Sequence, residues 1–72
     1  MISKEFELHF CEKVRALRTA QGLSLSELSR KSGVPLDLLR QMEQNILSDD
    51  FLVEHIFDLA GALGCAAYEL CQ

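Results

Sequence analysis

Apolar residues recur at intervals of three and four along most of the chain, which is the periodicity of an amphipathic helix. The first such stripe consists of Phe6, Phe10, Val14 and Leu17, and the one near the end consists of Val53, Ile56, Ala60 and Leu63. The pattern predicts an all-α chain with no strand, folded as one domain over residues 1–72. The helices are expected over about residues 3–21, 24–32, 35–45, 50–63 and 66–71.

The stretch LSLSELSRKSGVPLDLLRQMEQN, residues 23–45, carries the clearest local signals. Ser24 followed three residues later by Glu27 makes a capping box, which starts a helix. Gly33 can adopt the left-handed conformation that ends a helix without steric cost. Pro35 has a φ already suited to the first turn of the next helix. Two helices joined by a short turn that contains glycine form the helix-turn-helix layout.

Helical periodicity also predicts which side chains of this stretch face inward. Leu28 of the first helix, and Leu39 and Met42 of the second, are expected in the core. At 100° per residue, the opposite face of the second helix then presents Asp37, Arg40, Gln41 and Gln44, with Leu36 and Leu38 flanking it. Farther along, Asp49 or Asp50 is expected to cap the fourth helix, because a carboxylate there meets the positive end of the helix.

Charge is distributed unevenly, although the formal total is only −4. Residues 12–45 carry six basic and four acidic groups, a net of +2, whereas residues 46–72 carry five acidic groups and no Lys or Arg. An acidic total argues against tight nonspecific binding to nucleic acid. The chain has no apolar run of the ~20 residues that a membrane span needs, and its start shows no signal-peptide pattern. We therefore expect a cytoplasmic location.

Residue types that carry chemistry are sparse. Cys11, Cys65 and Cys71 are odd in number and lack the paired spacing of zinc ligands, so buried thiols in a reducing cytosol are expected. His55 stands alone on its helix and is expected to be partly exposed. No nucleophile–base pair, phosphate-binding glycine loop or metal cluster can be found. We therefore expect neither an enzyme nor a bound cofactor or metal.

Residues 14–70 resemble the phage-repressor helix-turn-helix family, which contains the Cro and lambda-repressor-like (XRE-type) domains. The matching segments are VRALRTAQGLSLSELSRKSGV, LLRQME and LAGALGCAAYEL. The resemblance implies a compact five-helix fold, with Gly22, Gly33 and Gly64 at turns of the family. It further implies sequence-specific binding to DNA, usually by a dimer, with the helix from Pro35 lying in the major groove.

On this interpretation, the polar side chains of the helix-turn-helix divide into two groups. Arg40 can pair with guanine, and Gln41 or Gln44 with adenine, as donor and acceptor positions in the major groove allow. Ser24, Ser26, Arg30 and Lys31 can hold the DNA backbone. The full candidate set is Ser24, Ser26, Arg30, Lys31, Asp37, Arg40, Gln41 and Gln44.

A second hypothesis follows from departures from the family pattern. Leu25 occupies a position that is often polar in the family, and the loop ILSDD after the third helix lacks basic residues. The scaffold could instead bind a protein partner through an apolar patch. That patch would consist of Leu25, Leu36, Leu38, Ile46 and Leu47. A DNA-binding dimer must leave the face of the third helix free, so it would pair through the C-terminal helix around Tyr68 and Cys71. An interaction module would instead bury the leucines of the patch. We expect the C-terminal contact.

Overall fold

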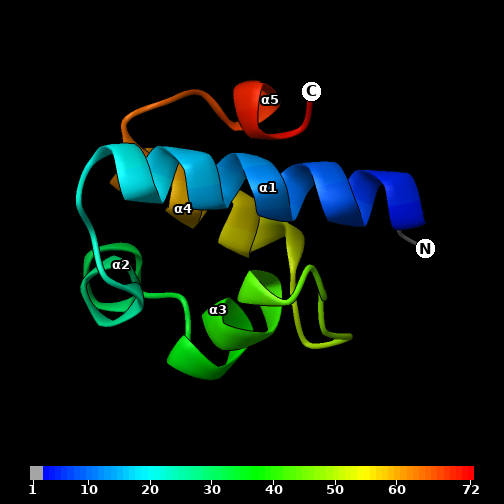
Figure 1. Cartoon of the computed structure of the whole chain (residues 1–72), viewed down its shortest axis with the longest axis horizontal. Coiled ribbons are helices and arrows are strands. Elements are labelled where there is room, and N and C mark those ends of the chain that lie inside the picture. The colour runs from blue at the N-terminus through cyan, green and yellow to red at the C-terminus, as the bar shows by residue number, and fades with distance from the viewer. Residues whose placement is uncertain (1–2) are drawn as a thin grey trace.

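Five α-helices form the computed structural model, which describes residues 3–72 and contains no strand within that range. Their bounds are α1 Lys4–Ala20, α2 Leu25–Ser32, α3 Leu36–Glu43, α4 Val53–Leu63 and α5 Ala67–Leu70. The predicted all-α class with five helices is confirmed. The long helix α1 crosses the molecule, with α2 and α3 on one side of it and α5 on the other (Figure 1).

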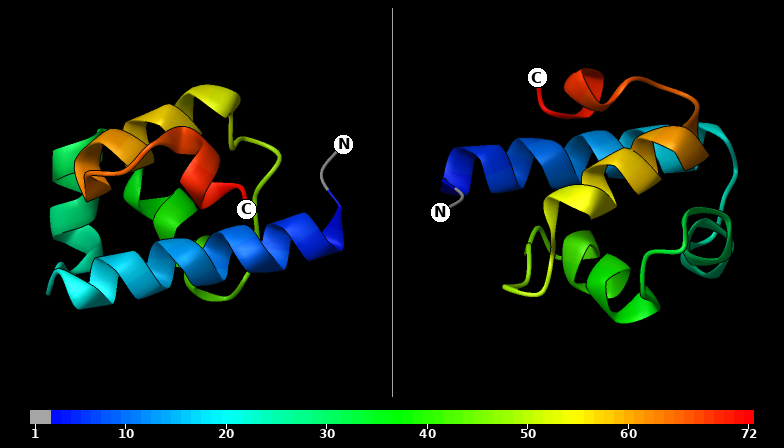
Figure 2. Two further views of the ribbon diagram at one scale, coloured as in Figure 1. Left: turned by 90° about the horizontal axis from the view of Figure 1, so that it is seen from above. Right: turned by 180° about the vertical axis from the view of Figure 1, so that it is seen from behind.

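The core lies between α1, which packs against α3, α4 and α5, and α2, which packs against α3 and α4, and every helix contributes to it. Its fully buried side chains include Phe10, Leu28, Leu39, Leu59 and Leu70, one from each helix in turn. Leu28, Leu39 and Met42 are buried as predicted. The views in Figure 2 show α5 and the pair α2–α3 on opposite sides of the layer made by α1 and α4. A surface on α5 is therefore well separated from one on α2 or α3.

Helix α3 ends two residues earlier than predicted. Asn45 takes a left-handed conformation, with a φ of 62°. The Asn45 N–H donates to the Met42 carbonyl (2.9 Å) and the Ile46 N–H donates to the Gln41 carbonyl (3.0 Å). These bonds are the two that close a Schellman motif, in which asparagine can replace the usual glycine. At the other end, Pro35 is the N-cap and not the first helical residue.

Helix α4 begins three residues later than predicted, and neither Asp49 nor Asp50 caps it. Asp49 and Asp50 lie in a turn, in which the Phe51 N–H donates to the Ser48 carbonyl (2.9 Å). The buried Phe51 then packs edge-on against Phe10, with ring centroids 5.6 Å apart. The N-cap is then Leu52. Its N–H donates to Nδ1 of His55 at 2.9 Å. The side-chain hydrogen bond at the start of α4 is therefore made by this imidazole, and not by the carboxylate that was expected.

Two predictions of burial are wrong, in opposite directions. Leu38 was expected beside the exposed face of α3, yet it is only 7% exposed, because α3 packs against both α1 and α2 and so buries a wide arc. Val53 was expected in the core as part of the apolar stripe of its helix, yet it is 69% exposed, and Phe57, one turn farther along, is 63% exposed. The aromatic contact at this end of the core is made by Phe51, and Ile56 is the residue of the first turn of α4 that packs against the core.

Candidate nucleic-acid interface

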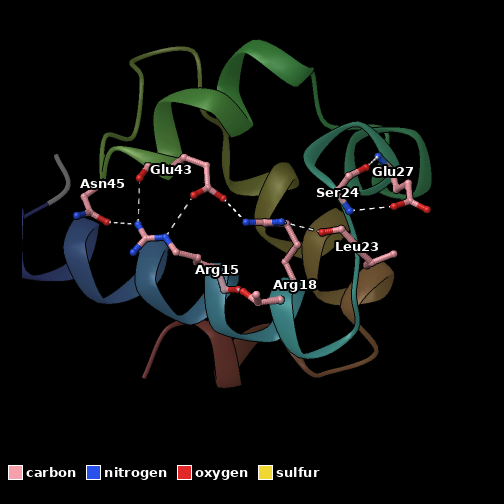
Figure 3. A network of polar contacts seen from close by, with 8 residues as sticks. Arg15, Arg18, Leu23, Ser24, Glu27, Glu43 and Asn45 are labelled. Carbon is pink, nitrogen blue, oxygen red and sulfur yellow. Dashed lines mark hydrogen bonds and ion pairs between the residues drawn. The ribbon is translucent and has the colours of Figure 1, made fainter.

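The start of α2 is held by the predicted capping box (Figure 3). The Ser24 hydroxyl accepts a hydrogen bond from the Glu27 N–H (3.1 Å), and a Glu27 carboxylate oxygen accepts one from the Ser24 N–H (2.9 Å). Hydrogen bonding of the Glu27 carboxylate to Ser24, first to its backbone N–H and then to its hydroxyl, lowers the pKa of Glu27 below its ordinary value. Ser24, a candidate contact to the DNA backbone, therefore already serves as the cap of α2.

Serine side chains fix the turn between α2 and α3. The Ser29 hydroxyl donates to the Val34 carbonyl at 2.6 Å, and the Val34 N–H donates to the Ser32 hydroxyl at 3.1 Å. Gly33 makes the turn possible with a φ of 82°, and the Val34 side chain is completely buried. Since the polar groups of the turn are satisfied within it, the relative position of α2 and α3 is well determined.

The outer face of α3 is polar. Asp37, Arg40 and Gln44 are exposed and Gln41 is half-buried, on the side of the helix opposite its buried apolar residues. One Arg40 guanidinium nitrogen lies 3.8 Å from an Asp37 carboxylate oxygen, and both side chains remain largely in solvent. The structure thus brings together on one face the four α3 residues of the candidate set.

On α2, the other candidate residues Ser26, Arg30 and Lys31 are exposed, so their side chains are accessible. The charged side chains exposed on α2 and α3 are Arg30, Lys31, Arg40, Glu27 and Asp37. Three basic groups against two acidic ones leave this surface with a net charge of only +1.

Two arginines that contributed to the basic count of this region are used inside the fold, a feature that the sequence analysis missed. Arg18 donates to a Glu43 carboxylate oxygen at 2.5 Å and to the Leu23 carbonyl at 2.7 Å. Arg15 donates to the Asn45 side-chain oxygen at 2.6 Å and to the Glu43 carbonyl at 3.2 Å (Figure 3). This network, which we call the α1–α3 clamp, ties the end of α3 to α1. No sequence signal pointed to it, because its partners lie 25–30 residues apart.

The apolar patch expected by the second hypothesis is not present as a continuous surface. Leu38 is buried, and Leu25 and Leu47 are half-buried against the core. Leu36 is half-buried, which leaves Ile46, at 44% exposed, as the one member of the set that is open to solvent. Leu25, the leucine that departs from the family pattern, therefore packs against the core of the domain.

Groups with the potential for other chemistry are few in the described part of the chain. Within residues 3–72, no three His, Cys, Asp or Glu side chains are grouped so that they could hold a metal ion. The three cysteines are free thiols. Burial, with a smaller contribution from Glu7, raises the pKa of Cys11 to about 11, so this thiol stays protonated and unreactive at neutral pH. None of the helices over the same range has both the length and the apolar character that a membrane span requires.

Comparison with known proteins identifies the family. A model of the helix-turn-helix family, HTH_3, matches residues 14–70, and the chain belongs to this family. A solved structure described as a hypothetical transcription factor, NHTF, from Neisseria is similar to it, with 25% sequence identity and a TM-score of 0.83. The similarity covers 100% of this chain and 82% of that one. No curated protein matches the chain.

Proposed function

We propose that this protein is a DNA-binding transcriptional regulator of the Cro and lambda-repressor type, which places α3 in the major groove. The observation that carries the proposal is the outer face of α3, where polar side chains are exposed while every α3 leucine is buried or half-buried. Membership of the helix-turn-helix family supports it, as does the similarity to a protein described as a transcription factor.

Base recognition is assigned to α3. The Arg40 guanidinium can donate two hydrogen bonds to O6 and N7 of guanine, and the amide of Gln41 or Gln44 can pair with adenine. Ser26, Arg30 and Lys31 of α2, and Ser24 through whatever hydrogen-bonding capacity its cap leaves, contact the DNA backbone. With a net charge of +1 among the exposed side chains of α2 and α3 and −4 on the chain, nonspecific attraction is weak, and binding depends mainly on base contacts.

A dimer completes the proposal. The described part of the chain measures 29 × 23 × 20 Å, less than the ~34 Å between successive major grooves, so two copies are needed to place an α3 in each. We assign the contact to the C-terminal end, where Tyr68 is 67% exposed and Cys71 is exposed. Because α5 lies on the side of the molecule away from α2 and α3, a contact there leaves both DNA-facing helices free (Figure 2).

The test is selection from a pool of random duplexes at low salt, followed by mobility-shift titrations of the selected duplex at several salt concentrations. Arg40→Ala should lose about 1–3 kcal/mol on the selected duplex and relax its base preference. Lys31→Ala should weaken all duplexes alike and reduce the slope of log affinity against log salt by about 1.

Lys4→Ala is the matched control, since Lys4 is exposed at the start of α1, outside α2 and α3 and outside the proposed dimer contact. It should leave both the affinity and the salt slope unchanged. If no motif is enriched by the wild-type chain at low salt, the proposed function is wrong.

A further inference from the structure

The exposed ion pair on α3 places a carboxylate, that of Asp37, on the surface that is proposed to face DNA. Asp37 stands in the first turn of α3, and its side chain is 87% exposed, while that of Arg40 is 66% exposed. Their closest charged atoms are 3.8 Å apart. An exposed pair of this kind contributes little to stability. Each side chain can therefore leave the ion pair and bind a group of a ligand instead.

The chemistry of a carboxylate limits what Asp37 can meet in DNA. An ionised carboxylate only accepts hydrogen bonds, and it is repelled by phosphates. Among base edges in the major groove, only the amino groups of cytosine and adenine donate hydrogen bonds. Adenine presents its N7 acceptor beside the amino group, which opposes a second carboxylate oxygen, whereas cytosine presents the N4 donor alone. Cytosine is therefore the base that suits Asp37.

The position of Asp37 suits this contact. In a helix-turn-helix, residues near the N-terminus of the recognition helix reach the base edges, and Asp37 is the second residue of α3. Arg40 lies one turn farther along on the same face. Since the two side chains are in contact, the bases that they read must lie in one base pair or in adjacent pairs, which are ~3.4 Å apart.

We infer that Asp37 is a specificity-determining residue, which accepts a hydrogen bond from cytosine N4 beside the guanine bound by Arg40. Each half-site then contains a cytosine and a guanine in the same or neighbouring base pairs. This inference rests on the proposed function and adds to it the base that is read by an acidic residue. The carboxylate also acts against wrong sequences, because next to any base edge without a donor it remains buried and unpaired.

A purely structural role for Asp37 makes a different prediction. Pro35 offers no side-chain cap to α3, so a carboxylate in the first turn also interacts favourably with the positive end of the helix. If that were its whole role, Asp37→Asn would lower the thermal stability and leave the selected sequence unchanged. Base preference is therefore the measurement that separates the two roles.

The experiment repeats the selection from random duplexes with Asp37→Asn and with Asp58→Asn. Asp58 is an exposed carboxylate on α4, so the control makes the same change of charge away from α3. Wild type and Asp58→Asn should select the same motif, with cytosine beside guanine. Asp37→Asn should switch the cytosine position to adenine, which an amide reads through N6 and N7, with a change in relative affinity of roughly fivefold or more. Binding of Asp37→Asn to unselected DNA should become stronger, because one negative charge has left the surface that faces phosphates.

The possible failures are distinguishable. An unchanged motif for Asp37→Asn overturns the inference and leaves the proposed function standing, and so does a wild-type motif that lacks the cytosine. A wild-type chain that enriches no motif overturns the proposed function together with the inference that rests on it. Circular dichroism melts of all three proteins ensure that each variant is folded at the temperature of the selection.

Discussion

Helices α3 and α4 both carry apolar residues at helical spacing, but the exposed face of α3 is polar, whereas that of α4 is apolar and acidic. The leucines at the start of α3 are buried or half-buried, and its outer face carries Asp37, Arg40 and Gln44. In the first two turns of α4, Val53 and Phe57 are exposed, and so are Glu54 and Asp58. Helix α4 packs against α1, α2 and α5, and all its buried residues lie in its second half, from Leu59 to Leu63. The place along a helix where its neighbours make contact, and not its own apolar periodicity alone, therefore decides which residues it buries.

The functional consequence follows from the same difference. The face of α3 is polar and nearly neutral, which suits the reading of bases, whereas residues 46–72, which include α4 and α5, carry five acidic groups and no Lys or Arg. An apolar and acidic surface is unsuited to DNA. Such a surface is compatible with contact between proteins, and the proposed dimer uses only its C-terminal end, around Tyr68 and Cys71.

The largest expected effect tests burial directly. Leu38→Ala should lower the free energy of unfolding by about 2–5 kcal/mol, because it leaves a cavity among the helices that pack around α3. Phe57→Ala, a larger truncation on the exposed face of α4, should change it by no more than about 0.5 kcal/mol. Urea denaturation followed by circular dichroism measures both. Equal losses for the two variants would contradict the assignment of these two faces.

The second prediction compares the two acidic residues of α3, Glu43 in the α1–α3 clamp and Asp37 on the exposed face. Glu43→Ala removes the carboxylate of the α1–α3 clamp and leaves the half-buried Arg18 without its charged partner. We expect a loss of about 1.5–3 kcal/mol in the free energy of unfolding. Asp37→Ala breaks the exposed pair with Arg40 on the same helix and should cost less than about 1 kcal/mol.

The same urea titrations measure this pair of variants. Should Asp37→Ala prove as destabilising as Glu43→Ala, the pair on the outer face of α3 would be part of the folded framework. It would then be a poor candidate for a group that exchanges its partner for a base.

The smallest expected effect concerns self-association, which we predict to be weak. Tyr68→Glu should raise the dimer dissociation constant by about tenfold or more, because a charge cannot be buried unpaired without a large cost. Leu36→Glu, on α3, should leave it unchanged. Dimerisation of the wild type should strengthen with added salt, since the two C-terminal ends are both acidic, whereas binding to DNA should weaken.

Sedimentation velocity at two salt concentrations measures these dissociation constants. The opposite result, in which Leu36→Glu alone becomes monomeric, would show that the face of α3 is a protein interface. The proposal that this face reads DNA would then fail.

Sequence alone determined the features whose partners lie within about one helical turn. The capping box of Ser24 and Glu27, the left-handed Gly33 and the inward positions of Leu28, Leu39 and Met42 all follow from local spacing. These signals are sufficient to predict five helices and the helix-turn-helix within them. They also predicted which polar residues form the outer face of α3, because the period of the helix alone places them opposite its buried side.

Tertiary structure decided the features that depend on residues far apart in the chain. Phe51, which lies just before α4, packs against Phe10 of α1. Glu43 forms ion pairs with Arg15 and Arg18, more than 20 residues away in the chain. Whether Leu38 or Val53 is buried likewise depends on which helices surround it. Such contacts have no local signature, because their energy comes from surfaces that meet only after the helices have packed.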